Sequence, residues 1–171
     1  MKITVVYDNE VKKEGLRAGW GFSALIESEE ASPILFDTGA DSSTLAHNMK
    51  ELNIDPKNIK TIVISHAHGD HTGGLSEILR INEMAELFLP SSFRRAFSGR
   101  RETMVEDAMQ IGEDVFSTGE LEGIEQSLAL KTEKGIFVVT GCAHPAMRNI
   151  LRRCLKVWKT LWHRWRLPRI S

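Results

Sequence analysis

The stretch "SHAHGDHTGG", Ser65–Gly74, places three histidines and one aspartate within six residues, directly after an apolar run. His66 and His68 are two residues apart, so on extended backbone both imidazoles point to the same side and can reach one ion. Asp70 and His71 follow where the chain is expected to turn toward a helix. We therefore interpret this stretch as a strand-to-helix junction whose histidines and aspartate bind metal.

The donor types narrow the choice of metal. Imidazoles together with a carboxylate suit zinc, iron or manganese rather than calcium. The stretch contains no cysteine, which favours an open site with a position for water over a closed structural site. Thr72 is a candidate cap of the following helix. The alternative is a histidine-rich surface turn without metal, but a strand-to-helix switch is where α/β folds place their sites, and this favours the metal.

Composition predicts a soluble globular chain. Its 171 residues suit one domain, alone or with a short appendage, and its hydrophobic fraction of 42% and charged fraction of 26% are ordinary for such a protein. No apolar run reaches the roughly eighteen residues of a membrane span, and the start "MKITVVYDNE" does not resemble a signal peptide. The two cysteines, Cys142 and Cys154, form no disulfide framework, so we expect a cytoplasmic protein with reduced thiols.

Apolar periodicity predicts an α/β (α+β) fold with a mixed sheet flanked by helices. Strands are expected at Lys2–Asp8, Gly21–Ser28, Pro33–Gly39, Asn58–Ser65 and Ala85–Pro90, with a hairpin over residues 127–141. Helices are expected over residues 42–54, Leu75–Met84 and 145–165. The polar, glycine-containing stretch 91–123 predicts irregular structure.

Several motifs together resemble the metallo-β-lactamase superfamily. "SHAHGDHTGGL" is similar to its HxHxDH signature, and "ILFDTG" is similar to a family strand and loop that carry an aspartate, here Asp37. "GCAHP" after "IFVVT" matches the place of a third family histidine, here His144. The segments "GLRAGWGFSALIE", "STGELEG" and "VVTGCAHP" are most similar to the dihydropteroate-synthase-like branch, and the resemblance covers roughly residues 3–151.

The resemblance implies a four-layer αββα sandwich and two divalent metal ions (zinc, iron or manganese). It implies that one metal binds His66, His68 and His144, and that Asp70 and His71 contribute to the second. A bridging water of lowered pKa would be the nucleophile or base. These five residues are the metal ligands that we expect.

Two further roles follow from the resemblance. Asp37 would orient a ligating histidine from behind, and Asp70 would also accept a proton during catalysis. The branch includes an enzyme that joins a dihydropterin to ribofuranosylaminobenzene phosphate. The resemblance therefore implies a metal-dependent hydrolase or transferase that acts on a small molecule, such as a pterin or a phosphorylated aromatic compound.

The family pattern stops after Ile150–Leu151. A glycine-rich "GGFH"-like turn, which supplies a further histidine to the second metal in this branch, does not occur in the sequence. We therefore expect a metallo-β-lactamase-like domain over residues 1–151, followed by an atypical basic tail over residues 152–171. The sandwich would be incomplete, with an exposed sheet edge, an uncovered apolar face and an incomplete second metal site.

The tail differs sharply in charge from the rest of the chain. All 23 acidic residues lie at or before Glu133, and the residues after it include nine basic ones. The tail's apolar residues fall on one helical stripe: Leu151, Leu155, Trp158, Trp162 and Trp165. One interpretation is a basic amphipathic helix that binds an anionic membrane or nucleic acid. The other, favoured because acids and family pattern end together, is an interrupted reading frame.

The stripe offers one more possibility, which is to cover the exposed face within the chain or across a homodimer. No membrane or nucleic-acid partner is expected except through the tail. Three hypotheses therefore stay open: an enzyme, a metal-binding relative without turnover, and a binding module that acts through the tail.

Three remaining side chains invite a role in the metal site. His47 lies within a helical pattern, so we interpret it as a surface or hydrogen-bonded histidine. His163 lies among the tryptophans of the tail and is not expected to reach the metals. Cys142 is two residues from the candidate ligand His144, but the default for a free cysteine is a small buried hydrophobe, and we expect that here.

Overall fold

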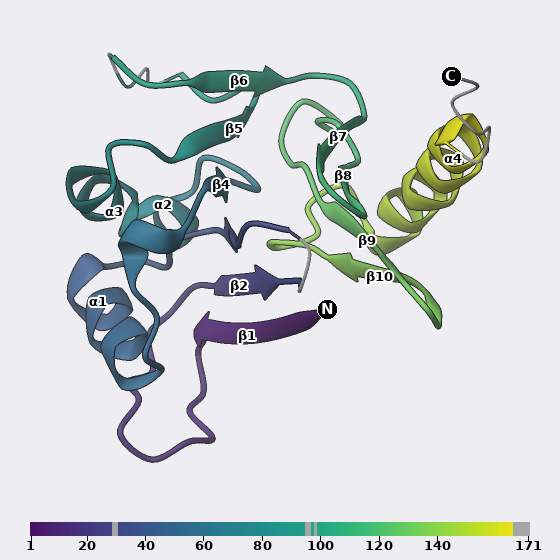
Figure 1. Cartoon of the computed structure of the whole chain (residues 1–171). Coiled ribbons are helices and arrows are strands. Elements are labelled where there is room, and N and C mark those ends of the chain that lie inside the picture. The colour runs from purple at the N-terminus through teal and green to yellow at the C-terminus, as the bar shows by residue number, and fades with distance from the viewer. Residues whose placement is uncertain (29–30, 95–96, 98, 166–171) are drawn as a thin grey trace, which may run out of the picture.

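The chain folds into four layers in which two β-sheets pack face to face and helices cover both outer faces, as the computed structural model shows (Figure 1). The structure describes residues 1–28, 31–94, 97 and 99–165, with side chains described as far as residue 160. Within these residues, no helix is both long and apolar enough to cross a membrane. The αββα sandwich that the family resemblance implies is confirmed.

The first sheet is mixed and has six strands in the order β1-β2-β3-β4-β5-β6. Its strands are β1 (Lys2–Tyr7), β2 (Ser23–Glu27), β3 (Ile34–Phe36), β4 (Thr61–Val63), β5 (Glu86–Pro90) and β6 (Glu102–Val105). The first three strands pair antiparallel, and β3 to β6 pair parallel. Parallel neighbours require crossover connections, and helices lie in the connections from β3 to β4 and from β4 to β5.

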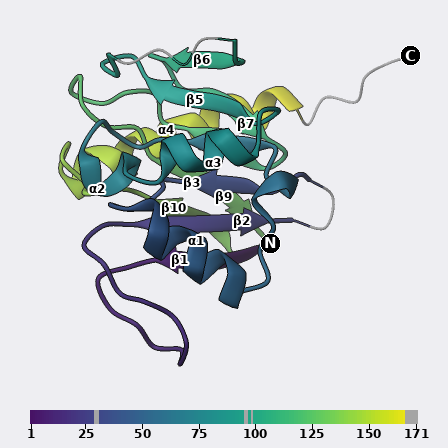
Figure 2. The same cartoon turned by 90° about the vertical axis from the view of Figure 1, so that its left-hand side faces the viewer.

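Those helices cover one face of the first sheet (Figure 2). They are α1 (Ser42–Glu51), the 3-10 turn η1 (Pro56–Asn58), α2 (Gly69–Thr72) and α3 (Leu75–Ile81). Asp41 caps α1 by accepting the backbone N–H of Thr44. The core between helices and sheet includes the buried side chains Leu45, Met49, Ile62, Ile64, Ile78 and Leu87.

The second sheet is antiparallel, with four strands in the order β10-β9-β8-β7. Its strands are β7 (Met109–Gly112), β8 (Val115–Ser117), β9 (Leu128–Thr132) and β10 (Gly135–Val139). The core between the two sheets contains Ile26, Ile34, Phe36, Val63, Phe88, Val105, Val115, Leu128, Leu130 and Val139. The candidate metal ligands follow the ends of β4 and β10, where a loop from the first sheet contacts a loop from the second.

The expectation of irregular structure over residues 91–123 is wrong, because β6, β7 and β8 lie there. Each of these strands has only three or four residues. Such short strands show too few alternations to be recognised by period. Their buried anchors, such as Val105 and Val115, are single side chains within a polar sequence.

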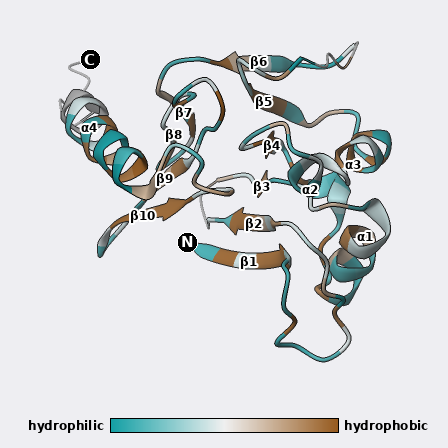
Figure 3. Cartoon of the chain, turned by 180° about the vertical axis from the view of Figure 1, so that it is seen from behind, coloured by the Kyte–Doolittle hydropathy of each residue, from teal (hydrophilic) through white to brown (hydrophobic). Residues whose placement is uncertain are grey.

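The last helix, α4 (Met147–Trp165), packs on the outer face of the second sheet. Figure 3 shows hydrophobic and hydrophilic residues in alternating bands along it. The apolar contact joins Ile150 and Cys154 to Leu121 and Ala129. This part of the outer face is therefore covered within the chain, which is one of the arrangements expected for the tail.

The buried line of α4 is not the stripe expected from the sequence. Leu151 and Leu155 are 44% and 54% exposed, whereas Ile150, Cys154 and Val157 are buried. The expected stripe runs through the large tryptophans, whereas the apolar contact with the sheet involves the neighbouring line that contains Ile150 and Cys154. The domain boundary expected after Leu151 falls inside α4 and stays a prediction. The side chains of Trp162, His163 and Trp165 lie outside the described ones.

Candidate metal centre

The histidine-rich segment follows β4, which ends at Val63. The backbone is still extended at His68, and α2 begins at the next residue. The hydroxyl of Thr72 donates to the carbonyl oxygen of His68 at 3.1 Å, four residues earlier. Thr72 is thus the last residue of α2, and the expectation that it caps a helix N-terminus is wrong.

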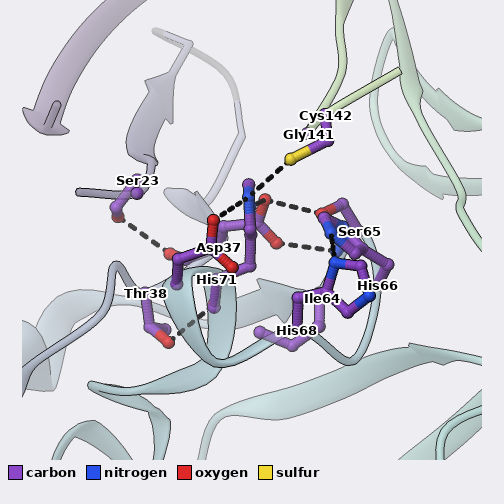
Figure 4. A network of polar contacts seen from close by, with 12 residues as sticks. Ser23, Asp37, Thr38, Ile64, Ser65, His66, His68, His71, Gly141 and Cys142 are labelled. Atoms are coloured by element: carbon purple, nitrogen blue, oxygen red, sulfur yellow. Dashed lines mark hydrogen bonds and ion pairs between the residues drawn. The ribbon is translucent and has the colours of Figure 1, made fainter. Parts of the chain in front are cut away.

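Asp37 lies behind this segment and is completely buried. Its backbone adopts φ 59°, in the left-handed region, where the carboxylate turns back toward the end of β4. It accepts the backbone N–H of Ser65 at 2.7 Å, the hydroxyl of Ser65 at 2.7 Å, and Nδ1 of His71 at 2.7 Å (Figure 4). The Ser65 hydroxyl in turn lies 2.8 Å from Nδ1 of His66.

These contacts fix the ring protons of two histidines. Because a carboxylate only accepts hydrogen bonds, Nδ1 of His71 must carry its proton toward Asp37. The Ser65 hydroxyl donates to Asp37, so it accepts from Nδ1–H of His66. Both Nε2 atoms are then left with a lone pair for a metal. Asp37 lies where the orienting role expected from the resemblance requires it.

Burial and charge shift the pKa of each of these groups. Burial lowers the pKa of His66 to about 4, helped by the neighbouring His71, so this ring is neutral at physiological pH. Burial also acts to lower the pKa of His71, but the hydrogen bond and charge of Asp37 outweigh it and raise that pKa. Desolvation raises the pKa of Asp37. Together, Asp37 and His71 keep a shared proton to higher pH than separated groups would.

The second segment, residues 140–144 after β10, is held by a different carboxylate. Glu125 is completely buried. It accepts the hydroxyl of Thr140 at 2.8 Å and three backbone N–H groups, those of Gly141 at 3.0 Å, Ala143 at 3.1 Å and His144 at 2.9 Å. The backbone at Ala143 has φ 59°, and these hydrogen bonds hold that turn.

Sequence reasoning missed Glu125. It stands just after "STGELEG", a segment noted only for its family resemblance. A signal was available, because Glu125 is a single acidic residue in the run "IEQSLAL", which leads into a buried strand. A buried charge there requires partners, although the sequence does not say which backbone donors supply them.

The two segments touch at Gly141. An added Cβ on this glycine would lie 2.4 Å from the hydroxyl oxygen of Ser65 and 3.1 Å from Nδ1 of His66. Gln126, the residue after Glu125, also links the two sheets, because its side-chain amide donates to the carbonyl oxygens of Ile64 at 2.9 Å and Phe88 at 3.2 Å. A residue without a side chain is therefore needed where the two loops meet.

The first donor group consists of three histidines. Nε2 of His66 lies 3.1 Å from Nδ1 of His68 and 3.2 Å from Nε2 of His144. His66 is buried, whereas His68 and His144 are exposed, so the group opens to solvent on one side. The fold thus brings together the three histidines that we expect to share a metal, although His66 and His144 are 78 positions apart in sequence.

The second donor group lies beside the first and is built around His71. Nε2 of His71 is 3.5 Å from Oδ2 of Asp70 and 3.3 Å from Sγ of Cys142. Cys142 is exposed, so the expectation that it is a small buried hydrophobe is wrong. Burial and the nearby carboxylates of Asp70, Glu125 and Asp37 raise the pKa of its thiol. Cys154 is the buried cysteine instead.

Both groups fit a divalent transition metal by the chemistry of their donors. A neutral imidazole offers one donor and one acceptor, so three converging ring nitrogens cannot all satisfy one another, whereas a shared cation would satisfy all three. The separations suit an ion at the usual nitrogen distance of about 2.0–2.1 Å. His47 lies elsewhere, with Nε2 2.7 Å from the carbonyl oxygen of Gly15, and is a hydrogen-bonded surface histidine as expected.

Comparison with known proteins leads to the same fold and motif. Residues 18–87 match the family model of the metallo-beta-lactamase superfamily. A curated relative from Methanocaldococcus jannaschii, named 7,8-dihydropterin-6-methyl-4-(beta-D-ribofuranosyl)-aminobenzene-5'-phosphate synthase, is 31% identical over an alignment of 192 positions, gaps included. The match covers 80% of this chain and 65% of that relative, so this chain matches just under two thirds of the relative's length.

Solved structures show the same fold at lower identity. A metallo-beta-lactamase from Thermotoga maritima, described as putative, superposes with a TM-score of 0.57 at 18% identity, over 81% of this chain and 77% of that one. A metallo-beta-lactamase with a HARLDQ motif from Cronobacter sakazakii superposes with a TM-score of 0.53 at 16% identity, over 81% and 67%. The family-model match over residues 18–87, the curated relative and the αββα layers thus agree in making this chain similar to the metallo-β-lactamase superfamily.

Proposed function

We propose that the chain is a metal-dependent enzyme that acts as a hydrolase or synthase on a pterin or a phosphorylated aromatic substrate. One observation carries this proposal. Two loops far apart in sequence bring three histidine rings together. A ring nitrogen of His68 and one of His144 each lie within 3.2 Å of Nε2 of His66, and the group opens to solvent on one side. Such an open, histidine-rich site is typical of catalytic rather than structural metal sites.

Each site residue has a role in this proposal. His66, His68 and His144 hold one metal, and Asp70 and His71 contribute to a second. When bound, divalent metals supply Lewis-acid polarisation of a substrate oxygen and lower the pKa of water. Asp70, whose side chain is 23% exposed, can accept a proton from solvent or substrate. Asp37 holds the ring proton of His71 on Nδ1, away from the substrate side.

The substrate class rests on the curated relative and on one aromatic side chain. The relative's name describes a synthase of a dihydropterin joined to a ribofuranosylaminobenzene phosphate. In this chain, Trp20 is 74% exposed and precedes Gly21, whose backbone packs against the carbonyl of Asp70. The next residue, Phe22, donates its N–H to that same carbonyl at 3.3 Å. The backbone that follows Trp20 thus contacts the carbonyl of Asp70, and we infer that the exposed indole offers a planar ring a surface for stacking.

The test compares two histidine variants of the full chain loaded with zinc, manganese or iron. Substrates are a dihydropterin with ribofuranosylaminobenzene phosphate, and generic phosphodiesters, esters and lactones. We expect turnover that falls by about a hundredfold or more in His68→Ala and is unchanged in His47→Ala, which removes a histidine outside the site. Equal activity of the two variants, or a wild-type chain that retains no metal, would contradict the proposal.

A second candidate function is metal binding without turnover. It is favoured by the second donor group, because within the described residues that group has only one histidine that is not shared with the first. This alternative predicts one tightly bound metal and no reaction with any of the substrates above. Turnover that is lost in Asp70→Asn would exclude it.

A further inference from the structure

The second donor group contains a thiol that no expected ligand set includes. Sγ of Cys142 lies 3.3 Å from Nε2 of His71 (Figure 4). His66, His71 and Cys142 offer ligand atoms that all lie within 4.8 Å of one another. Asp70 reaches the same imidazole nitrogen from 3.5 Å. The cluster thus combines imidazole, carboxylate and sulfur around one point.

The imidazole at the centre of this cluster is fixed for metal binding. His71 is only 2% exposed, and Asp37 holds its Nδ1 proton. Its Nε2 atom, which offers a lone pair when the ring is neutral, faces Cys142 and Asp70. A buried imidazole oriented by a carboxylate, with its other nitrogen facing further donors, is the usual arrangement of a ligating histidine.

The thiol is presented to the cluster by its backbone. Glu125 accepts the N–H groups of Gly141 and Ala143, the two residues on either side of Cys142. Cys142 is an exposed residue, so an ion from solvent can reach this side of the cluster. The carboxylates of Asp70, Glu125 and Asp37 act on the thiol from nearby, and a divalent cation would balance this negative charge.

We propose that Cys142 binds the second metal of the site as a thiolate, together with His71 and Asp70. The inference rests on the proposed metal-dependent function, and it adds a ligand that changes which metals the site prefers. Binding forms a metal–sulfur bond and releases the thiol proton to solvent. Because thiolate is a softer ligand than carboxylate, the second position favours zinc or cobalt over manganese or magnesium.

The simpler alternative is a thiol that only hydrogen-bonds to His71. The two cases differ when the full chain, reduced and freed of metal with a chelator, is titrated with cobalt(II) chloride without oxygen. We expect about two cobalt ions per chain, as in two-metal sites, and a near-ultraviolet thiolate-to-cobalt absorption that grows with the second ion. Cys142→Ser is expected to lose this absorption and to bind about half as much cobalt. Cys154→Ala, which removes the buried thiol, is the matched control and keeps both.

A second measurement does not depend on a variant. Bound cobalt or zinc should slow alkylation of Cys142 in the wild-type chain by about tenfold or more, since a coordinated thiolate is a poorer nucleophile. Mass spectrometry of the peptide that contains Cys142 gives the rate directly. Equal rates with and without metal would overturn the inference.

The outcomes separate the inference from the proposed function. A wild-type chain that binds no cobalt would contradict the metal-dependent function itself. A chain that binds cobalt without the thiolate absorption, or whose absorption persists in Cys142→Ser, would overturn only the role of Cys142. A Cys142→Ser chain that retains its circular dichroism but loses the absorption and half of the cobalt supports it.

Discussion

Two buried carboxylates, Asp37 and Glu125, hold the two loops of the site in different ways. Asp37 accepts one backbone N–H, one hydroxyl and one imidazole nitrogen. Glu125 accepts three backbone N–H groups and one hydroxyl, but no imidazole. Asp37 therefore acts mainly on the ring protons of candidate ligands, and Glu125 acts on the path of the backbone that carries them.

Because their partners differ, Asp37 should mainly affect the metal affinity of the site, and Glu125 should mainly affect the conformation of its backbone. Loss of the Asp37 charge changes which nitrogen of His66 and His71 carries a proton, while the loop can stay in place. Loss of the Glu125 charge leaves backbone donors without their acceptor, so the turn that carries Cys142 and His144 must rearrange. Substitution at the two positions should thus give different ratios of lost stability to lost metal affinity.

Glu125→Gln should give the largest loss of stability. The amide keeps one acceptor oxygen but turns an NH₂ group toward backbone donors, which leaves buried N–H groups unpaired. We expect the free energy of unfolding to fall by about 3–5 kcal/mol, the range for breaking a buried charged network. Urea denaturation of the metal-free chain measures it, and metal titration should show weaker binding at both donor groups.

Glu122→Gln is the control for this variant. Among the described residues, Glu122 accepts one side-chain hydrogen bond, from Asn149 at 2.8 Å, and that bond is exposed. An exposed hydrogen bond contributes little, so a change within about 0.5 kcal/mol is expected. If Glu125→Gln were no more destabilising than Glu122→Gln, the comparison of the two carboxylates would break.

This contrast also shows what the sequence could and could not reveal. Four of the candidate ligands lie within six residues of one another, so local geometry alone can bring them together: His66, His68, Asp70 and His71. Asp37 and His144 were placed by motif resemblance. Glu125 was missed because its partners are backbone groups, which have no signature in the sequence. A metal ligand can be predicted from other ligand residues nearby in the sequence. The backbone groups that a buried carboxylate accepts are determined only by the fold.

Cys142 and the short strands show the same limit. Cys142 was predicted to be buried because free cysteines usually are, but the turn held by Glu125 leaves it exposed, with its sulfur facing His71. The strands β6 to β8 were missed because tertiary pairing, rather than a local period, makes them strands. The four layers were implied by the family resemblance alone. The longer apolar segments predicted a mixed sheet flanked by helices.

Asp37→Asn should reduce metal affinity more than stability. The new NH₂ group would donate to Nδ1 of His71 and to the Ser65 hydroxyl, which in turn would donate to Nδ1 of His66. Both rings would then carry the proton on Nε2, where the metal needs a lone pair. We expect metal affinity to fall by about 10–100-fold, measured by competition with a chelating dye.

Ser65→Ala sharpens this prediction, because it cuts the link to His66 and leaves the contact between Asp37 and His71 intact. Its effect should fall mainly on the first donor group and be smaller than that of Asp37→Asn. Equal losses at both donor groups in Ser65→Ala would contradict the proposed control of ring protons.

Gly141→Ala tests the contact between the two loops. The added Cβ would lie 2.4 Å from the hydroxyl oxygen and 3.0 Å from Cβ of Ser65, so one loop must shift. Overpacking of this kind typically costs about 1–3 kcal/mol, and thermal unfolding of the metal-free chain would show it. Gly69→Ala is the matched control, because its Cβ would meet nothing within 4 Å, and its effect should be neutral or slightly stabilising.

The smallest expected effect is on the pH dependence of stability in the metal-free chain. Burial lowers the pKa of His66, helped by the neighbouring His71, whereas at His71 the hydrogen bond and charge of Asp37 outweigh burial and raise the pKa. The raised pKa of His71 adds stability that is complete below the ordinary value of 6.5 and is lost as pH rises through the folded value. The pKa of His66, lowered to about 4, removes stability as pH falls from 6.5 toward 4.

Stability of the chelator-treated chain should therefore be greatest near or just above pH 6.5 and fall on both sides, as far as these two rings decide it. Denaturation of His66→Gln over the same pH range should show a flatter acid side, because the buried ring that resists protonation is gone. The alkaline side should flatten in Asp37→Asn, since His71 then has no carboxylate to hold its proton. If instead both variants kept the wild-type slopes, the hydrogen bonds of Asp37 would not control the protonation of either ring, and the contrast with Glu125 would rest on backbone shape alone.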